Sequence, residues 1–189
     1  RRIAEIEALA RAAGVSVRRV DAQALSKLAG EGVHQGVVAE VRPMPPWVED
    51  DLLAALREAR TPLVLALDGV QDPHNLGACL RTADACGVLA VIVPKDRAAQ
   101  VNATVRKVAA GAAETTPVVA VTNLSRSLKL LKEAGLWVVG AAGEADQLAS
   151  AAGLSGPLVL GMGAEGSGLR GRTRKNCDSV ICSPQTCNA

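Results

Sequence analysis

Short, continuous apolar runs alternate with segments of helical spacing through the chain after residue 60. Apolar runs without polar alternation are typical of strands buried on both faces. Between them, apolar residues recur at every third or fourth position, which predicts helices. The expected strands are 63–68, 89–94, 117–122, 136–142, 157–163 and 178–182, and the expected helices are 75–86, 100–110, 123–134 and a short one after 144. This order predicts an α/β fold, a parallel sheet with helices on both faces.

The pattern before residue 42 is different and predicts a small αβαβ piece. A helix, an alternating strand, a second helix that starts after Asp21 and ends at Gly30, and a second strand are expected at 2–13, 15–20, 22–29 and 36–41. The proline-rich RPMPPW then predicts an extended, semi-rigid linker, followed by a linking helix. We therefore expect three parts, 1–42, 43–60 and 61–189.

The stretch LVLALDGVQDPHNLGACLRTADACG, residues 63–87, is the strongest functional signal in the chain. It predicts a buried strand, a loop of turn-forming residues, and a helix with Asn75 as its N-cap and Gly87 as its stop. Ligands bind at the carboxyl ends of strands in open α/β sheets. We therefore expect Asn75 and Arg81 beside a ligand, with Gly77 allowing its close approach.

Composition excludes several classes of protein. Hydrophobic residues make up 49% of the chain, yet it has no Phe or Tyr and two Trp, which argues against the aromatic stacking platforms of single-strand nucleic-acid binders. A net charge of +2 does not by itself indicate nucleic acid. No apolar run approaches a membrane span, and the amphipathic first helix is unlike a signal peptide. We expect a soluble, cytoplasmic protein, and the Arg1-Arg2 start suggests a fragment.

The five cysteines predict reduced thiols rather than a disulfide framework. Cys177, Cys182 and Cys187 are spaced C-x4-C-x4-C, at the loose edge of zinc-ligand spacing, and neither histidine is nearby in sequence. We expect no metal.

A glycine-rich segment, GMGAEG at 161–166, has the G-x-G-x-x-G spacing of dinucleotide-binding loops. Too few residues follow it for the second half of a dinucleotide-binding domain, so a dinucleotide oxidoreductase is the weaker alternative. Such a loop still lets backbone approach a ligand closely and offers N–H donors.

The segments LDGVQDPHNLGACLRTADACGV, NATVRKVAAGAAE and LVLGMGAEGSGLR resemble the SpoU/TrmH family of RNA ribose 2'-O-methyltransferases. GVHQGVVAEV resembles the end of that family's L30-like substrate-binding domain. The resemblance implies a SPOUT-type parallel sheet with a trefoil knot after a partial L30-like domain. It also implies S-adenosylmethionine as cofactor, a homodimer, and a guanosine of 23S rRNA as substrate.

The resemblance also assigns catalytic roles by matching position. Asn75 and Arg81 correspond to the family's N-x-G-x-x-x-R motif, in which Asn75 orients groups and Arg81 meets the ribose 2'-OH and its phosphate. Because a guanidinium keeps its proton, we expect Arg81 to stabilise charge rather than act as a base. Glu165 matches the second-motif acid that supports Asn75 or Arg81. His74 is an alternative base, although a plain loop histidine is the simpler interpretation.

The remaining implied contacts are with cofactor and RNA. Ala141, Gly163 and Ser183 would line the cofactor site, whereas Arg81, His34 and Arg170 would contact RNA. Where the family continues with a third motif and a closing helix, this chain reads CSPQTCNA, with Ser183 in place of an apolar residue. We therefore expect an incomplete knot and exposed apolar sheet surface. A catalytically inactive homologue that binds RNA weakly is the alternative to an active enzyme.

Overall fold

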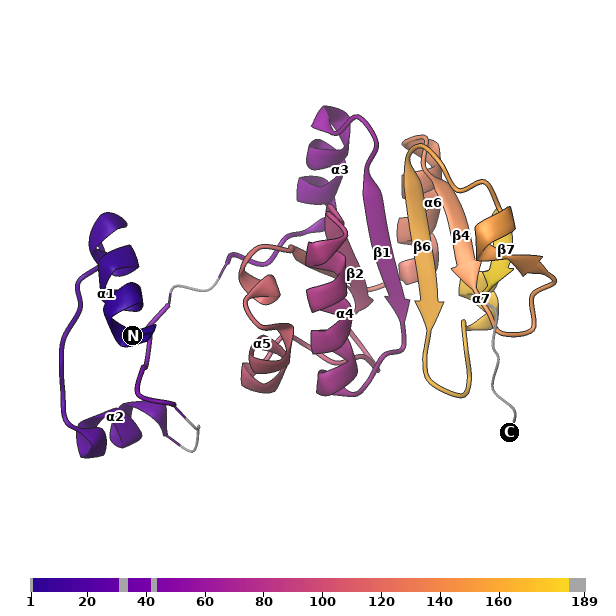
Figure 1. Cartoon of the computed structure of the whole chain (residues 1–189). Helices are drawn as coiled ribbons and strands as arrows, with labels where there is room; N and C mark the ends of the chain where they lie inside the picture. Colours follow the sequence, from indigo (N-terminus) through magenta and orange to yellow (C-terminus); the bar gives the residue numbers. More distant parts are fainter. Residues whose placement is uncertain (1, 31–33, 42–43, 184–189) are drawn as a thin grey trace. The chain divides into compact units, whose positions relative to one another are not determined.

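The computed structural model describes residues 2–30, 34–41 and 44–183. The chain divides into two compact units, Arg1–Pro43 and Met44–Ala189 (Figure 1). The helix predicted to link the two domains, α3 (Glu49–Glu58), belongs to the second unit, because Leu52 and Leu56 are buried in its core.

The first unit contains two helices, α1 (Arg2–Ala12) and α2 (Ala22–Ala29). Asp21 caps α2 as predicted, and its Oδ1 accepts the backbone N–H of Ala24 at 2.7 Å. The strands predicted at 15–20 and 36–41 are wrong, because both segments are irregular. Alternation of apolar residues marks one face of a segment, but a strand also needs a neighbouring backbone to pair with, and these segments pair with none in the described parts of the chain.

The second unit is built on a seven-stranded sheet in which every neighbouring pair is parallel. Its order is β3-β2-β1-β6-β4-β7-β5. The strands are β1 (Leu63–Asp68), β2 (Ala90–Pro94), β3 (Val118–Val121), β4 (Trp137–Ala141), β5 (Gln147–Leu148), β6 (Leu158–Gly163) and β7 (Ser179–Cys182). Six of these strands confirm the predicted ones to within a residue at each end.

Helices cover both faces of the sheet, as the continuous apolar strands predict (Figure 1). One core cluster joins α3 and α6 (Leu124–Glu133) to the sheet, and the other joins α4 (Pro73–Ala85) and α5 (Ala103–Ala109) to its opposite face. Asn102 and Asn123 cap α5 and α6 with their side-chain oxygens. Among the described residues, no helix is long and apolar enough to cross a membrane.

Three short elements differ from the predicted pattern. The helix expected after residue 144 is instead the two-residue strand β5 followed by a 3-10 turn, Ala149–Ala151. The basic segment forms a one-turn helix, α7 (Gly171–Arg174). Both residues of β5 are exposed, and among the described strands it pairs with β7 alone. No apolar periodicity therefore marked it in the sequence.

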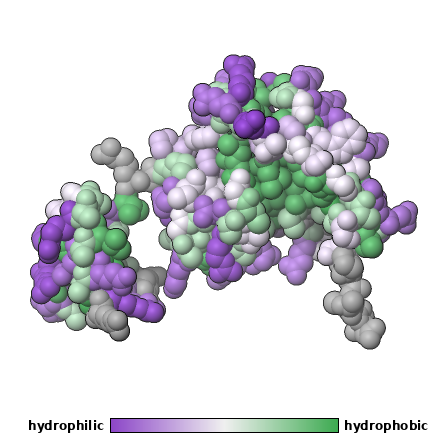
Figure 2. All heavy atoms as spheres, turned by 45° about the horizontal axis from the view of Figure 1, so that its top comes forward, coloured by the Kyte–Doolittle hydropathy of each residue, from purple (hydrophilic) through white to green (hydrophobic). Residues whose placement is uncertain are grey.

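Apolar side chains of the larger unit gather into a broad surface area (Figure 2). Trp137 on β4 and Met162 on β6 are 54% and 40% exposed. Met162 pairs in register with Leu67 of β1, and Trp137 pairs with Leu158 of β6, which itself pairs with Leu63 of β1. Both residues therefore lie on the face that α4 and α5 cover farther along the sheet. The part of the sheet formed by β4 and β6 therefore has exposed apolar surface on this face, and such surface is typically covered by a partner.

Gly77 serves helix packing, and the prediction that it admits a ligand is wrong. A Cβ at this position would lie 2.7 Å from Cβ of Val108 and 2.9 Å from the carbonyl oxygen of Val105, where α4 meets α5. Only a residue without a side chain allows this close approach of the two helices.

We expect Gly77→Ala to lower the free energy of unfolding by about 1–3 kcal/mol, the usual cost of overpacking. Chemical denaturation of the full chain measures it. Gly171→Ala is the matched control, because no atom lies within 4 Å of its added Cβ. Equal stability of the two variants would contradict the packing role of Gly77.

Candidate active site

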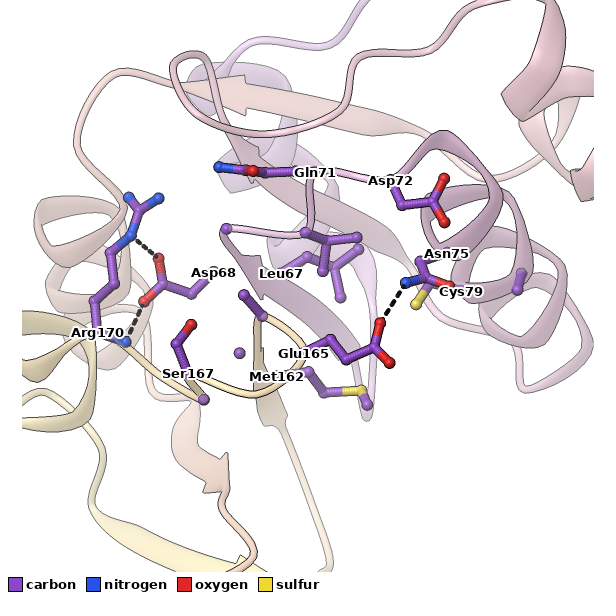
Figure 3. A pocket seen from close by; sticks show the side chains of 16 residues that line it. Leu67, Asp68, Gln71, Asp72, Asn75, Cys79, Met162, Glu165, Ser167 and Arg170 are labelled. Carbon is purple, nitrogen blue, oxygen red and sulfur yellow. Dashed lines mark hydrogen bonds and ion pairs between the residues drawn. The ribbon is translucent and has the colours of Figure 1, made fainter.

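A cavity of about 690 Å³ opens where β1 and β6 end side by side. Its walls are the loop after β1, the loop after β6, and the first turns of α4 (Figure 3). From β1 the chain passes through α4 to β2 on one side, and from β6 it passes through α7 toward β7 on the other. The chain therefore leaves β1 and β6 toward opposite edges of the sheet, and the cavity lies between these two strands. Open α/β sheets bind ligands at such a point.

Asn75 is not the N-cap of α4, contrary to the sequence prediction. Asp72 is the cap, since its Oδ1 accepts the backbone N–H of His74 at 2.9 Å, and Pro73 takes the first helical position. The Asp-Pro pair was the signal for this start, because proline favours the first position of a helix. The side chain of Asn75 is left free to face the cavity.

Asn75 and Glu165 face each other across the cavity, as Figure 3 shows. Nδ2 of Asn75 donates to Oε2 of Glu165 at 3.5 Å, a long contact between residues 90 positions apart. The sequence allowed Asn75 or Arg81 as the partner of Glu165, and the structure places Asn75 beside it.

Glu165 sits on a tight loop after β6. Ala164 and Gly168 exchange backbone hydrogen bonds of 3.1 and 2.9 Å, and Gly166 and Gly168 have positive φ angles of 76° and 64°. The loop leads into the four-residue α7, not into the long helix that would hold a pyrophosphate. The dinucleotide interpretation of this glycine segment therefore lacks structural support.

Arg81 is exposed on α4, three residues after the cavity-lining Ala78, and does not itself line the cavity. His74 is also exposed and gives its backbone N–H to Asp72. The roles of both side chains stay predictions.

His34 belongs to the first unit, where it makes local contacts. Its Nδ1 accepts the N–H of Gly36 at 3.0 Å, and its Nε2 lies 3.3 Å from Oγ of Ser26. These contacts join His34 to α2 and to Gly36, and the predicted RNA contact stays a prediction.

The three residues predicted to hold the cofactor lie at the ends of three neighbouring strands. Ala141 ends β4, Gly163 ends β6, and Ser183 directly follows β7. These strands are adjacent in the order β6-β4-β7, and all run in parallel. Gly163 also lines the cavity beside β1.

Asp68 is a site residue that the sequence analysis did not single out. It is 1% exposed, and Oδ2 accepts the backbone N–H of Arg170 at 2.9 Å (Figure 3). Oδ1 lies 3.6 Å from Nε of Arg170, whose side chain is 46% exposed. The sequence signal for Asp68 was a carboxylate at the end of an otherwise apolar strand. Arg170 is thus held at the cavity, and its predicted contact with RNA would use the exposed part of its guanidinium.

Cys79 lines the cavity from α4 and is half-buried, whereas Cys86 at the end of the helix is exposed. Burial raises the pKa of the Cys79 thiol, so less of it is thiolate at a given pH, and only the thiolate is nucleophilic. We expect iodoacetamide at pH 8 to alkylate Cys79 at least severalfold more slowly than Cys86. Mass spectrometry of timed samples measures both rates, and a faster Cys79 would contradict this environment.

The fold and the cavity define an α/β protein with a cavity at the carboxyl edge of a parallel sheet. The chain belongs to the SpoU rRNA Methylase family, whose model matches residues 62–188. A second model, for RNA 2'-O ribose methyltransferase substrate binding, matches residues 1–47. The resemblance found in the sequence is therefore confirmed.

Relatives and solved structures agree with this family. The chain is 54% identical to the 23S rRNA (guanosine-2'-O-)-methyltransferase RlmB of Pectobacterium atrosepticum, over 96% of this chain and 73% of the relative. It is 64% identical to the protein of that name from Pseudomonas aeruginosa, over 82% of this chain and 62% of the relative. The chain thus spans about two thirds of these relatives.

Among solved structures, the AdoMet-bound rRNA methyltransferase from Sinorhizobium meliloti has a TM-score of 0.70 and 26% identity, over 99% of this chain and 70% of that one. The SpoU methyltransferase AviRb from Streptomyces viridochromogenes has a TM-score of 0.68 and 25% identity, over 77% and 57%. These neighbours confirm the predicted α/β fold class.

Proposed function

We propose that this chain is an S-adenosylmethionine-dependent methyltransferase that modifies a ribose 2'-OH of a 23S rRNA guanosine. The observation that supports it most is the pair formed by Asn75 and the Glu165 loop at the ends of β1 and β6. Relatives more than half identical carry the corresponding activity in their names. Because that substrate is ribosomal RNA, the proposal places the protein in the cytoplasm.

The residues at the ends of β4, β6 and β7 fit S-adenosylmethionine. Ala141, Gly163 and Ser183 would hold it chiefly through backbone groups, and small side chains leave those groups accessible. When bound, the cofactor supplies a methyl group on a positively charged sulfur. No metal is part of this proposal.

The side chains of this chain would contribute alignment and electrostatics. Arg81 would contact the phosphate beside the target ribose and keep its own proton. It would stabilise negative charge on the 2'-oxygen as the hydroxyl proton leaves to solvent water. Asn75 would orient the ribose, and Glu165 would hold the Asn75 amide in place. Exposed groups of Arg170, and His34 in the substrate-binding unit, would add contacts to RNA.

We also propose a homodimer in which a second copy covers apolar sheet surface near Trp137 and Met162. Both side chains are 40% exposed or more on one face of the sheet. Sedimentation equilibrium at micromolar concentration tests this, and a strictly monomeric species would contradict it.

Calorimetric titration and methyl transfer test the function together. Titrating the folded chain with S-adenosylmethionine should give saturable binding, whereas NADH should give none. Radiolabelled methyl groups should then pass to 23S rRNA that lacks the modification, and nuclease mapping should place them on a ribose 2'-oxygen. Binding of RNA without binding of the cofactor would instead support the inactive homologue.

A further inference from the structure

Asp68 is a buried carboxylate at the end of β1, where it is 1% exposed. Burying a charge is costly unless hydrogen bonds or an opposite charge compensate for it. Both compensations come from Arg170, through its backbone N–H at 2.9 Å and its Nε at 3.6 Å. Asp68 therefore joins β1 to a residue 102 positions later in the chain.

Asp68 contacts both ends of the loop that follows β6. In the parallel pairing of β1 with β6, Asp68 is the register partner of Gly163, where the loop begins. Its side chain binds Arg170, where the loop ends. Between them, the reciprocal bonds of Ala164 and Gly168 close the loop on itself. Because both ends of the loop are fixed to Asp68, the Glu165 backbone has little freedom to move away from Asn75.

Gly69 leaves room for this arrangement. A Cβ there would lie 3.1 Å from Nη2 of Arg170, and its φ of 88° disfavours any other residue. The guanidinium of Arg170 therefore lies directly over the backbone that follows Asp68.

We propose that Asp68 is a positioning residue that fixes the loop 163–170 and so sets Gly163 and Glu165 in the geometry used for cofactor and substrate. This inference rests on the proposed function for its catalytic consequence, but the anchoring of the loop is measurable without activity. Asp68 itself lines the cavity and acts through the loop.

Hydrogen–deuterium exchange on the full chain tests the anchoring. In Asp68→Ala, peptides covering 164–170 should exchange at least tenfold faster than in the wild type, while peptides from α6 should not change. Arg170→Ala is the matched variant, because it removes the side chain and keeps the backbone N–H that Asp68 binds. It should accelerate exchange much less. Unchanged exchange in Asp68→Ala would overturn the proposal.

Asp68→Asn keeps the test decisive if the alanine variant does not fold. Its carbonyl oxygen still accepts the N–H of Arg170, but it no longer carries the charge that faces the guanidinium. Loop exchange should therefore lie between that of the wild type and that of a loop without its anchor. If a folded Asp68→Asn variant exchanges in the loop at the wild-type rate, the role given to the charge of the carboxylate is overturned.

Kinetics tests the catalytic consequence. In Asp68→Asn, kcat should fall about tenfold with a smaller change in KM for RNA, because the loop is displaced while the RNA surface remains. A wild-type chain without methyl transfer would refute the proposed function, yet the exchange comparison would still decide whether Asp68 holds the loop. If exchange in the loop is faster but kcat is unchanged, the positioning role of Asp68 is refuted while its anchoring of the loop stands.

Discussion

Gly163→Ala is expected to abolish measurable binding of S-adenosylmethionine and to lower the free energy of unfolding by about 3 kcal/mol or more, at the upper end of overpacking effects. A Cβ on residue 163 would overlap the carbonyl carbon of Gly168 and the backbone nitrogen of Leu169. Both are backbone atoms, so no side-chain rotation relieves the contact. The loop after β6 would have to open and carry Glu165 with it.

Gly161→Ala is the matched control for this prediction. It changes the same strand by the same methyl group, but its nearest contacts are 3.5 Å to the carbonyl oxygen of Val139 and 3.7 Å to Leu169, ordinary van der Waals distances. Denaturant titration and calorimetry should find Gly161→Ala close to wild type in both stability and cofactor affinity. If the two variants behave alike, the tight closure of the loop at Gly163 is not what the site requires.

Arg81→Ala is expected to lower kcat for methyl transfer by about 10²- to 10³-fold, the usual cost of removing a group that stabilises developing charge. Arg81 is exposed on α4, so its loss should leave the free energy of unfolding within about 0.5 kcal/mol of wild type. Single-turnover assays with saturating RNA and cofactor separate this loss from weaker RNA binding.

Two further variants sharpen the interpretation of Arg81. Arg81→Lys keeps the positive charge and loses the planar fork that binds phosphate through two hydrogen bonds, so it should recover part of the lost rate. Arg126→Ala removes an exposed arginine from α6, on the opposite face of the sheet, and should leave kcat unchanged. Equal losses in Arg81→Ala and Arg126→Ala would show a general effect of charge on RNA binding.

Much of the sheet could be predicted from sequence, because strands buried on both faces appear as unbroken apolar runs. LVLALD and AVIVP are such runs, and both are strands over the predicted residues or within one of them. Sequence patterns failed at 15–20, where the strand was predicted from alternation, and at 36–41, because these segments pair with no strand in the described ranges. Pairing depends on a second segment, and no local pattern reports whether that segment is available.

The sequence by itself determined the α/β class, the family and the identity of Asn75, Arg81 and Glu165 as candidates, because residue types and short spacings carry this information. Tertiary structure alone decided which of them meet. Asn75 faces Glu165 across 90 residues, and Asp68 holds Arg170 across 102. Both contacts exist because β6 inserts beside β1 in the sheet. The order of parallel strands is fixed by the packing of the whole sheet and its helices, and no single stretch of the chain encodes it.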